Sequence, residues 1–358
     1  MRVLFHLLDA GVGGAQRVAG DIAGELARRG HEIAIVVPSD GPALDRFRAL
    51  DASVYILDAG TLRRPLAVAR LARIARRHDL LYSHTSAPGQ IIGGFAARLA
   101  GTSHVVHHHT YPYFSTRTAI RSGQTRLFPI ALRRARFIAV ADHVADGLVT
   151  VGGIPRERIV VIPNGVALRD AAESTNDPPR IGMLARLDPG KGILTFIAAA
   201  STLGRTTPAT FVIGGQEGPF AAYSERVRVE AAQAEAELVV PVDDGAAFLA
   251  TLDVVVIPSE YEGSPLVLLE AMSLGKAIVA SDIPGIRELL PAGAGILIPV
   301  GDVESLARAL GELAAHPERR RELGSRAREL VRQNHDLEAS LQRVADVIEQ
   351  TAPLRAGG

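Results

Sequence analysis

The chain has 358 residues, 47% of them hydrophobic and 22% charged, which excludes wholesale disorder and indicates two domains rather than a single core. It contains no Cys, which excludes disulfides, thiolate zinc sites, iron–sulfur clusters and a Cys nucleophile, and its lack of Trp with only 4% aromatic residues disfavours a nucleic-acid partner. The net charge is zero, and no apolar run approaches the ~18 residues of a membrane-spanning helix, so we expect a cytoplasmic protein.

The first half of the chain alternates short apolar runs with helical patterns. Residues 3–8 form an apolar run closed by an acid and glycines, which is typical of a strand and not of a signal peptide. Further strands are expected at 32–37, 54–57, 80–83, 105–108 and 137–141, and helices at 15–29, 42–50 and 65–77. Near-continuously apolar strands separated by helices are typical of a parallel sheet covered on both faces.

The same alternation restarts in the second half. Residues 169–179 are polar, contain two prolines and are the best linker candidate. Strands are then expected at 180–184, 210–214, 238–241, 254–257, 277–280 and 295–298, and helices at 303–315, 317–333 and 337–350. The sequence therefore predicts an α/β protein with two doubly wound, Rossmann-like domains, at 1–168 and 180–335, and a helix at 336–352 that packs back towards the first domain.

Charge is divided unevenly between the two halves. Residues 1–168 carry 21 Arg and no Lys against 12 acids, a net charge of +9, and residues 169–358 carry −9. Twelve of these Arg lie in two stretches: Arg63, Arg64, Arg70, Arg73, Arg76 and Arg77, then Arg117, Arg121, Arg126, Arg133, Arg134 and Arg136. The first stretch alternates with apolar residues at helical spacing. Such a helix is compatible with a solvated face or with an anionic partner, such as a phosphorylated acceptor or an anionic membrane surface.

In parallel sheets, ligands bind at the carboxyl ends of strands, beside helix N-termini, and two such domains facing each other would enclose a cleft. Residues 11–16, Gly-Val-Gly-Gly-Ala-Gln, follow the first strand. They fail the dinucleotide pattern G-x-G-x-x-G/A because its last position is Gln16, which disfavours an NAD oxidoreductase. The loop suits one phosphate or a sugar, and a plain strand–helix turn is the alternative.

Two cations follow the strand that opens the second domain. Arg186 and Lys191 lie five residues apart, across a Pro-Gly turn and just before a helix. A guanidinium fork and an ammonium at the positive end of a helix can hold a diphosphate. The alternative is that both side chains are merely solvated.

Two carboxylates follow the strand at 254–257. Glu262 lies in the loop, and Glu270 lies eight residues later, on a helix that starts near Pro265. At ~1.5 Å rise per residue they are at most about 12 Å apart along the axis, so they could serve opposite ends of an extended ligand such as a nucleotide sugar. The alternatives are a capping role for Glu262 and a surface position for Glu270. The backbone between them would offer a phosphate site formed by Gly263, Ser264, Pro265, Leu266 and Val267.

These motifs, in this order, resemble glycosyltransferase family 4, the retaining GT-B enzymes of glycosyl transferases group 1, over roughly residues 1–350. Glu262 and Glu270 resemble the family's E-x7-E motif, with Ser264 where an aromatic is common. Residues 13–18 resemble its glycine loop, in which Glu usually stands in place of Gln16. Residues 162–166 resemble its interdomain segment, and residues 186–192 its R-L-…-K-G pair.

The resemblance implies a role for each matching residue. Arg186 and Lys191 would hold the donor diphosphate and offset the charge of the leaving group. Glu262 would contact the transferred sugar, and Glu270 would bind the ribose hydroxyls. The amides of Gly13 and Gly14 would face the distal phosphate.

The run His107, His108 and His109 ends a strand of the first domain. The family usually has a His there, near the anomeric centre; the run leaves the assignment open, and His109 is preferred because it is nearest the loop. Successive side chains on a strand point to opposite faces, so these three histidines cannot converge on a metal ion. There is also no Asp-x-Asp triplet. We therefore expect neither a metal nor a cofactor.

The resemblance as a whole implies a retaining, metal-independent, hexosyltransferase-like enzyme that moves a sugar from a nucleotide-sugar donor to an acceptor. Family members of this type are thought to react by same-face attack assisted by the leaving phosphate, so no enzyme nucleophile is named. The alternatives are another GT-B enzyme, namely a nucleotide-sugar epimerase or a phosphorylase, and a non-catalytic GT-B binding scaffold. The basic first half favours an anionic or lipid-linked acceptor, such as a polysaccharide or glycolipid precursor of the cell envelope, and peripheral association with the inner membrane surface.

Overall fold

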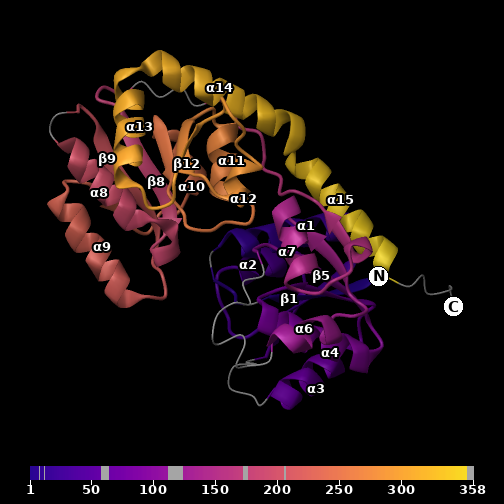
Figure 1. Ribbon diagram of the computed structural model, residues 1–358. Helices are drawn as coiled ribbons and strands as arrows, with labels where there is room; N and C mark the ends of the chain where they lie inside the picture. Colours follow the sequence, from indigo (N-terminus) through magenta and orange to yellow (C-terminus); the bar gives the residue numbers. More distant parts are fainter. Residues whose placement is uncertain are drawn as a thin grey trace. The chain divides into compact units, whose positions relative to one another are not determined.

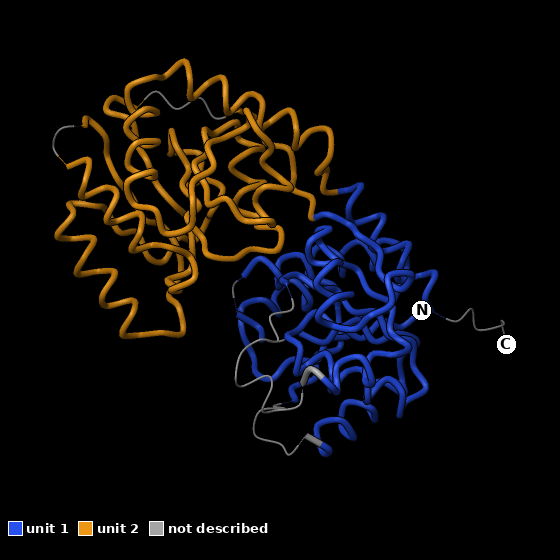
Figure 2. The backbone as a smooth tube through the Cα atoms, viewed as in Figure 1, with its two compact units in different colours: residues 1–163, 338–358 blue, residues 164–337 orange. Residues whose placement is uncertain are grey.

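Parallel strands run through both halves of the chain. The computed structural model describes residues 1–7, 9–11, 13–57, 64–111, 124–171, 176–204 and 207–352. The chain divides into two units, one of residues 1–163 with 338–358 and one of residues 164–337 (Figure 2).

The first unit is built on a parallel sheet with the strand order β3-β2-β1-β4-β5-β6-β7. Its strands are β1 (Arg2–Leu7), β2 (Glu32–Val37), β3 (Ser53–Ile56), β4 (Leu80–His84), β5 (Ser103–His108), β6 (Arg136–Ala139) and β7 (Ile159–Val161). The chain winds outward from β1 in one direction and then, from β4, in the other. The switch point between β1 and β4 is where a doubly wound sheet leaves its strand ends open to a ligand.

Helices cover both faces of this sheet because its strand side chains alternate between the faces (Figure 1). They are α1 (Gly14–Arg28), α2 (Leu44–Arg48), α3 (Arg64–Ala75), α4 (Ala87–Ala100), α6 (Gln124–Ala131), α7 (Asp142–Thr150), the 3-10 turn η1 (Arg156–Arg158) and α15 (Leu337–Thr351). Phe5 belongs to a buried cluster with Ile22 of α1 and Ile348 of α15, whereas its neighbour Leu4 belongs to a cluster with Leu71 of α3.

The second unit repeats this plan with the parallel strand order β10-β9-β8-β11-β12-β13. The strands are β8 (Arg180–Arg186), β9 (Thr210–Gln216), β10 (Glu237–Val239), β11 (Val254–Ile257), β12 (Ala277–Ser281) and β13 (Ile296–Ile298). The helices are η2 (Pro189–Lys191), α8 (Ile193–Leu203), α9 (Ala221–Gln233), α10 (Gly245–Ala250), α11 (Leu266–Ser273), α12 (Pro284–Arg287), α13 (Val303–Ala315) and α14 (Pro317–Asn334). Val254 and Val256 pack into one buried cluster and Val255 and Ile257 into the other.

The predicted α/β architecture of two doubly wound, Rossmann-like domains is confirmed. The short strand β7 was not predicted. The strand expected to reach Pro241 ends at Val239, because a proline has no N–H to donate to a ladder. None of the described helices is long and apolar enough to cross a membrane.

The division between the units falls at Pro163, ahead of the boundary that the sequence placed at residue 168. Backbone pairing accounts for this position. Val166 forms an isolated bridge with Asp336, and its N–H donates to the His335 carbonyl at 2.9 Å. A Cβ on Gly165 would lie 2.5 Å from the Asp336 carbonyl oxygen, so the two crossing segments are in backbone contact.

The last helix, α15, joins the first unit after the chain has passed through the second. Its Ala345 and Ile348 are fully buried in the cluster that contains Val3 and Phe5. At its edge, the Arg29 guanidinium contacts Asp346 at 2.7 Å and Glu349 at 3.0 Å. The core of the first unit is therefore completed by the end of the chain.

We expect Ile348→Ala to lower the free energy of unfolding of the first unit by about 2–5 kcal/mol, since it leaves a cavity in that core. Urea unfolding followed by circular dichroism measures the change. Gln350→Ala, at an exposed position of the same helix, should change it by less than about 0.5 kcal/mol. Equal stability of the Ile348→Ala variant and the unmodified chain would contradict this account of α15.

Candidate active site

In the second unit, the predicted ligand-binding residues gather at the switch point of the sheet. β8 lies between β9 and β11, and the chain winds outward from it in both directions. Arg186 ends β8 and is followed by η2 with Lys191, while the loop after β11 carries Glu262. Parallel neighbouring strands end at the same edge of a sheet, so the two loops meet there.

Lys191 and Glu262 form an ion pair across this edge. The Lys191 Nζ atom lies 2.7 Å from Glu262 Oε1, and the Ser259 hydroxyl donates to the same oxygen at 2.8 Å. The Lys191 side chain is 30% exposed and that of Glu262 is 11% exposed. The structure thus brings together a predicted phosphate-binding cation and a predicted sugar-binding carboxylate, 71 residues apart in sequence.

Two glycines of the turn make this pairing possible. Gly192 has a φ of +68°, and a Cβ there would lie 2.0 Å from the Pro258 carbonyl oxygen. A Cβ on Gly190 would lie 2.7 Å from the Tyr261 ring, and the Gly190 carbonyl accepts a hydrogen bond from the Glu260 N–H at 3.0 Å. Only glycine permits this φ and this backbone approach without strain. The turn is therefore packed directly against the loop that carries Glu262.

Arg186 is also paired. Its guanidinium is half-exposed, and Nη2 lies 3.2 Å from Oδ2 of Asp188. The other oxygen of Asp188 accepts the Gly190 N–H at 3.1 Å, as an N-cap of η2. Sequence reasoning missed Asp188, although an acid just before a helical turn is itself a capping signal. Both predicted cations therefore have a carboxylate partner, Asp188 for Arg186 and Glu262 for Lys191.

The loop that carries Glu262 leads into α11 and packs against α12. α11 begins at Leu266, with Pro265 as its N-cap and no side-chain cap, so Glu262 does not cap it. A Cβ on Gly285 of α12 would lie 2.3 Å from the Glu262 carbonyl oxygen. Gly263, Ser264 and Pro265 are buried, and Leu266 and Val267 are partly buried.

Glu270 is buried in α11 and is only 8% exposed. The surface position considered for it is therefore wrong. Leu268, Leu269, Ala271 and Met272 around it are all fully buried. A carboxylate kept among apolar neighbours needs polar contacts that offset its desolvation.

Asn164 is a positioning residue that sequence reasoning did not single out within its segment. It is buried, and its amide Nδ2 donates to the Ser264 carbonyl at 2.9 Å. Its own carbonyl accepts from Nδ1 of His335 at 3.1 Å. Burial lowers the pKa of His335, and the hydrogen bond to the Asn164 carbonyl partly opposes this shift. The segment before the loop thus fixes the backbone at Ser264.

In the first unit, the glycine loop leads into α1. Gly13 is the N-cap of α1 and no side chain caps the helix, so its positive end is not occupied by a carboxylate of its own. Gln16 donates from Nε2 to Asp9 Oδ1 at 2.8 Å, and the Gly11 N–H donates to the same oxygen at 2.8 Å. The amide accounts for the departure from the family pattern, since an ionised Glu could not donate to Asp9. Gly14 is exposed.

The three consecutive histidines separate as the strand alternation requires. His107 and His109 share one face, with ring centroids 4.3 Å apart, and His84 at the end of β4 lies beside them. His108 points to the other face, where its Nδ1 atom lies 3.0 Å from Nε2 of Gln90. His84 was missed, although it too stands at the carboxyl end of a strand.

Burial sets the protonation of these rings. It lowers the pKa of His84 to about 3 and the pKa of His108 to about 4. Burial, reinforced by the neighbouring imidazoles, holds the pKa of His107 and of His109 well below the usual value. These rings are therefore neutral at pH 7, and His109 can take part in hydrogen bonds but not as an imidazolium acid.

Sequence comparison gives matches over nearly the whole chain. Residues 12–170 match the family "Glycosyltransferase Family 4", and residues 167–330 match "Glycosyl transferases group 1". A 2-deoxystreptamine N-acetyl-D-glucosaminyltransferase of Streptomyces fradiae is 30% identical, over 78% of this chain and 72% of that protein. This chain belongs to the family 4, group 1 glycosyltransferases. Another relative of this glycosyltransferase is a GDP-mannose-dependent alpha-(1-6)-phosphatidylinositol monomannoside mannosyltransferase of Mycolicibacterium smegmatis, 26% identical over 94% of both chains.

Solved structures share the fold of this glycosyltransferase. HepE of Anabaena, solved in complex with UDP-glucose, matches with a TM-score of 0.84 and 22% identity, over 98% of this chain and all of that one. A sucrose-phosphate synthase of Thermosynechococcus elongatus matches with a TM-score of 0.78 and 18% identity, over 98% and 99% of the two chains. The predicted GT-B fold is thus confirmed.

Substitution Gly192→Ala should destabilise the second unit more than Gly301→Ala. Both glycines have a positive φ, +68° and +74°, but a Cβ at Gly301 meets nothing within 4 Å. We expect about 1 kcal/mol for Gly301→Ala, from strain alone, and at least about 2 kcal/mol for Gly192→Ala, where the backbone at Pro258 must also move. Equilibrium urea unfolding of both variants measures the difference, and equal costs would disprove the close contact.

Proposed function

We propose that this glycosyltransferase transfers a sugar, with retention of its anomeric configuration and without a metal at the diphosphate, from a nucleotide-sugar donor. The observation that carries the proposal is the Lys191–Glu262 ion pair at the switch point of the second sheet, where Arg186 ends β8. Two fixed cations suit a diphosphate, and an adjacent carboxylate suits sugar hydroxyls. The relatives named above support a nucleotide sugar as the donor, since GDP-mannose and UDP-glucose appear in their descriptions.

The pairing of Lys191 with Glu262 gives this site a specific chemistry. A diphosphate reaching Lys191 meets an ammonium that already has a carboxylate partner, so the phosphate must share or replace that contact. A carboxylate displaced from Lys191 can then accept hydrogen bonds from the hydroxyls of the transferred sugar. As the glycosidic bond to phosphate breaks, negative charge grows on the leaving diphosphate, and Arg186 and Lys191 stabilise it. In this proposal the two cations take the role that a metal ion has in other transferases.

The remaining roles follow from burial and position. Glu270, buried on α11, would accept hydrogen bonds from the ribose hydroxyls, and the backbone from Gly263 to Val267 would contact the phosphates. The N-terminus of α1 at Gly13 and Gly14 offers uncapped amides to an anionic or hydroxyl group. His109, neutral through burial, would act near the anomeric centre as a hydrogen-bonding group. The attacking acceptor hydroxyl would lose its proton to the leaving phosphate, so no enzyme nucleophile is required.

The first unit supplies a surface suited to an anionic or lipid-linked acceptor. Arg70 and Arg73 of α3 and Arg76 and Arg77 directly after it are exposed, while Leu71 and Ala75 of the helix are buried. Exposed leucines accompany the cations: Leu66 is 52% exposed, and Leu99 on the neighbouring helix α4 is 54% exposed. Arg63, Arg117 and Arg121 lie outside the described residues, as does the side chain of Arg64. Cations with interspersed apolar side chains are typical of binding at an anionic membrane surface.

We expect one nucleotide-sugar class among UDP-, GDP- and ADP-sugars to raise the melting temperature in the absence of metal. At a concentration of about 100 times Kd, the stabilisation is about 2.7 kcal/mol, or roughly 5–10 °C for a domain of this size. Lys191→Ala and Arg186→Ala should each weaken binding about 10- to 100-fold, since each removes a charged hydrogen bond. Isothermal calorimetry measures the affinity.

Arg226→Ala, at an exposed cation of the same unit, is the matched control and should bind as the unmodified chain does. No binding of any nucleotide sugar by folded protein would contradict the proposal, as would an equal loss in the control. The anomeric configuration of the product, measured by proton NMR, tests retention: a β-linked product from an α-linked donor sugar would exclude it.

Charge reversal of Arg70, Arg73 and Arg77 to Glu should weaken binding to vesicles that contain anionic lipids by about 100-fold. Each cation near such a surface contributes about 1 kcal/mol. Vesicle sedimentation measures the binding, and neutral phosphatidylcholine vesicles should bind neither protein. The control reverses Arg226, Arg308 and Arg332, which are exposed in the second unit, and changes the net charge by the same amount. If the first variant changes neither vesicle binding nor acceptor turnover, the membrane proposal fails.

A further inference from the structure

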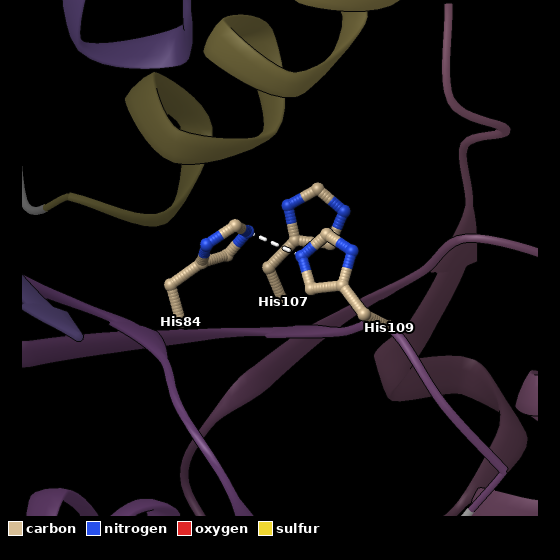
Figure 3. A group of neighbouring side chains, drawn as sticks. All are labelled: His84, His107 and His109. Carbon is tan, nitrogen blue, oxygen red and sulfur yellow. Dashed lines mark hydrogen bonds between the residues drawn. The ribbon is translucent and has the colours of Figure 1, made fainter. Parts of the chain in front are cut away.

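Three imidazoles from two neighbouring strands converge in the first unit (Figure 3). His84 ends β4, His107 lies in β5 and His109 follows that strand. His107 and His109 share a face because they are two residues apart, and the parallel pairing of β4 with β5 places His84 beside them. One nitrogen from each ring lies within 4.8 Å of one from each of the others.

The rings of His84 and His109 are in direct contact. Their Nε2 atoms face each other in a hydrogen-bonding contact. A neutral imidazole has one N–H and one lone pair, so one of these rings can donate to the other, and a cation bound by both lone pairs can take the place of that proton. His84 is 4% exposed and His109 is partly buried, which leaves little room for water to separate them.

The third ring is oriented by a buried tyrosine. Nδ1 of His107 lies 2.5 Å from the Tyr82 hydroxyl oxygen, and both residues are buried. Nε2 of His107 is also buried and has no hydrogen-bond partner within the described parts of the chain. If Nδ1–H donates to Tyr82, the Nε2 lone pair is free to coordinate. Metal-binding histidines typically have their other nitrogen fixed in this way.

We propose that His84, His107 and His109 bind one divalent transition-metal ion, with Zn²⁺ as the ion best suited to them. Three neutral imidazoles form a known zinc-binding set, and they leave one coordination position for water or another oxygen ligand. The set contains no oxygen ligand, which excludes Ca²⁺ and Mg²⁺ as its natural occupants. His108, in the same run, takes no part because it points to the other face.

This site is distinct from the residues proposed to bind the diphosphate. The histidines belong to the first unit, whereas Arg186 and Lys191 belong to the second. Diphosphate binding therefore remains independent of metal in this proposal. Binding of Zn²⁺ to the histidines is measured without an assay of sugar transfer. A bound ion would hold the ring of His109 in one orientation, and so would affect the residue placed near the anomeric centre.

Full-length protein, freed of metal with a chelator, should bind one equivalent of Zn²⁺ in calorimetry and in elemental analysis after dialysis. His84→Gln and His109→Gln should each weaken binding at least about tenfold, and Tyr82→Phe should weaken it about 10- to 100-fold by releasing the ring of His107. His108→Gln is the matched control, because His108 is buried and belongs to the same run of histidines. The affinity of this variant for Zn²⁺ should equal that of the unmodified protein. Circular dichroism confirms that each variant is folded.

Co²⁺ provides a second measurement that needs no variant. The unmodified protein with one equivalent of Co²⁺ should show the visible absorption of a four-coordinate ion with imidazole ligands. Absence of one-equivalent Zn²⁺ binding to the folded chain, or a six-coordinate Co²⁺ spectrum, would overturn the proposal in favour of a hydrogen-bonded imidazole pair. So would binding that His108→Gln abolishes and that His84→Gln and His109→Gln leave intact.

Discussion

The candidate active site of this glycosyltransferase depends on a backbone contact between two loops. The turn at residues 190–192 lies directly against the loop at 258–261, with the Gly190 carbonyl bonded to the Glu260 N–H and no space for a Cβ at Gly192. That contact sets Lys191 beside Glu262. Any side chain on these glycines would separate the cation from the carboxylate. The ion pair of the site therefore requires glycine at positions 190 and 192.

Sheet topology places the other functional groups of the molecule. Both sheets are doubly wound, so each has a switch point from which the chain winds outward in both directions and at which neighbouring strands end at the same edge. At the switch point of the second sheet, cations and carboxylates meet. Near that of the first sheet, the ends of β4 and β5 carry buried imidazoles, and the end of β1 carries the glycine loop. One fold thus presents two chemically different sets of side chains at equivalent positions of its two units.

Much of the fold followed from local pattern. Apolar runs of four to six residues between helical patterns indicated parallel strands. The polar segment 169–179 was expected to be the linker, whereas the division between the units lies at Pro163. The pattern failed for two short strands. β7 has only three residues and was not predicted, and β10 ends before Pro241, although the hydropathy pattern continues to that residue. Residues 162–166 were expected to be an interdomain segment, but their pairing with 335–336 was not predicted, because two backbone segments pair there without a characteristic side chain. Asn164 gained its role from that pairing.

The sequence by itself determined the class of protein, the two-domain plan, and which motifs carry the chemistry, because hydrophobic periodicity and motif order are local properties. It also determined that His107 and His109 share a face while His108 does not, since alternation along a strand is fixed. Only the tertiary structure decided that Lys191 pairs with Glu262, that Asp188 takes Arg186, and that His84 completes a group of three imidazoles. The first and the last of these depend on which strands are neighbours, and Lys191 and Glu262 are 71 residues apart in the chain. The contact between Asp188 and Arg186 is local and depends on the shape of the turn after β8.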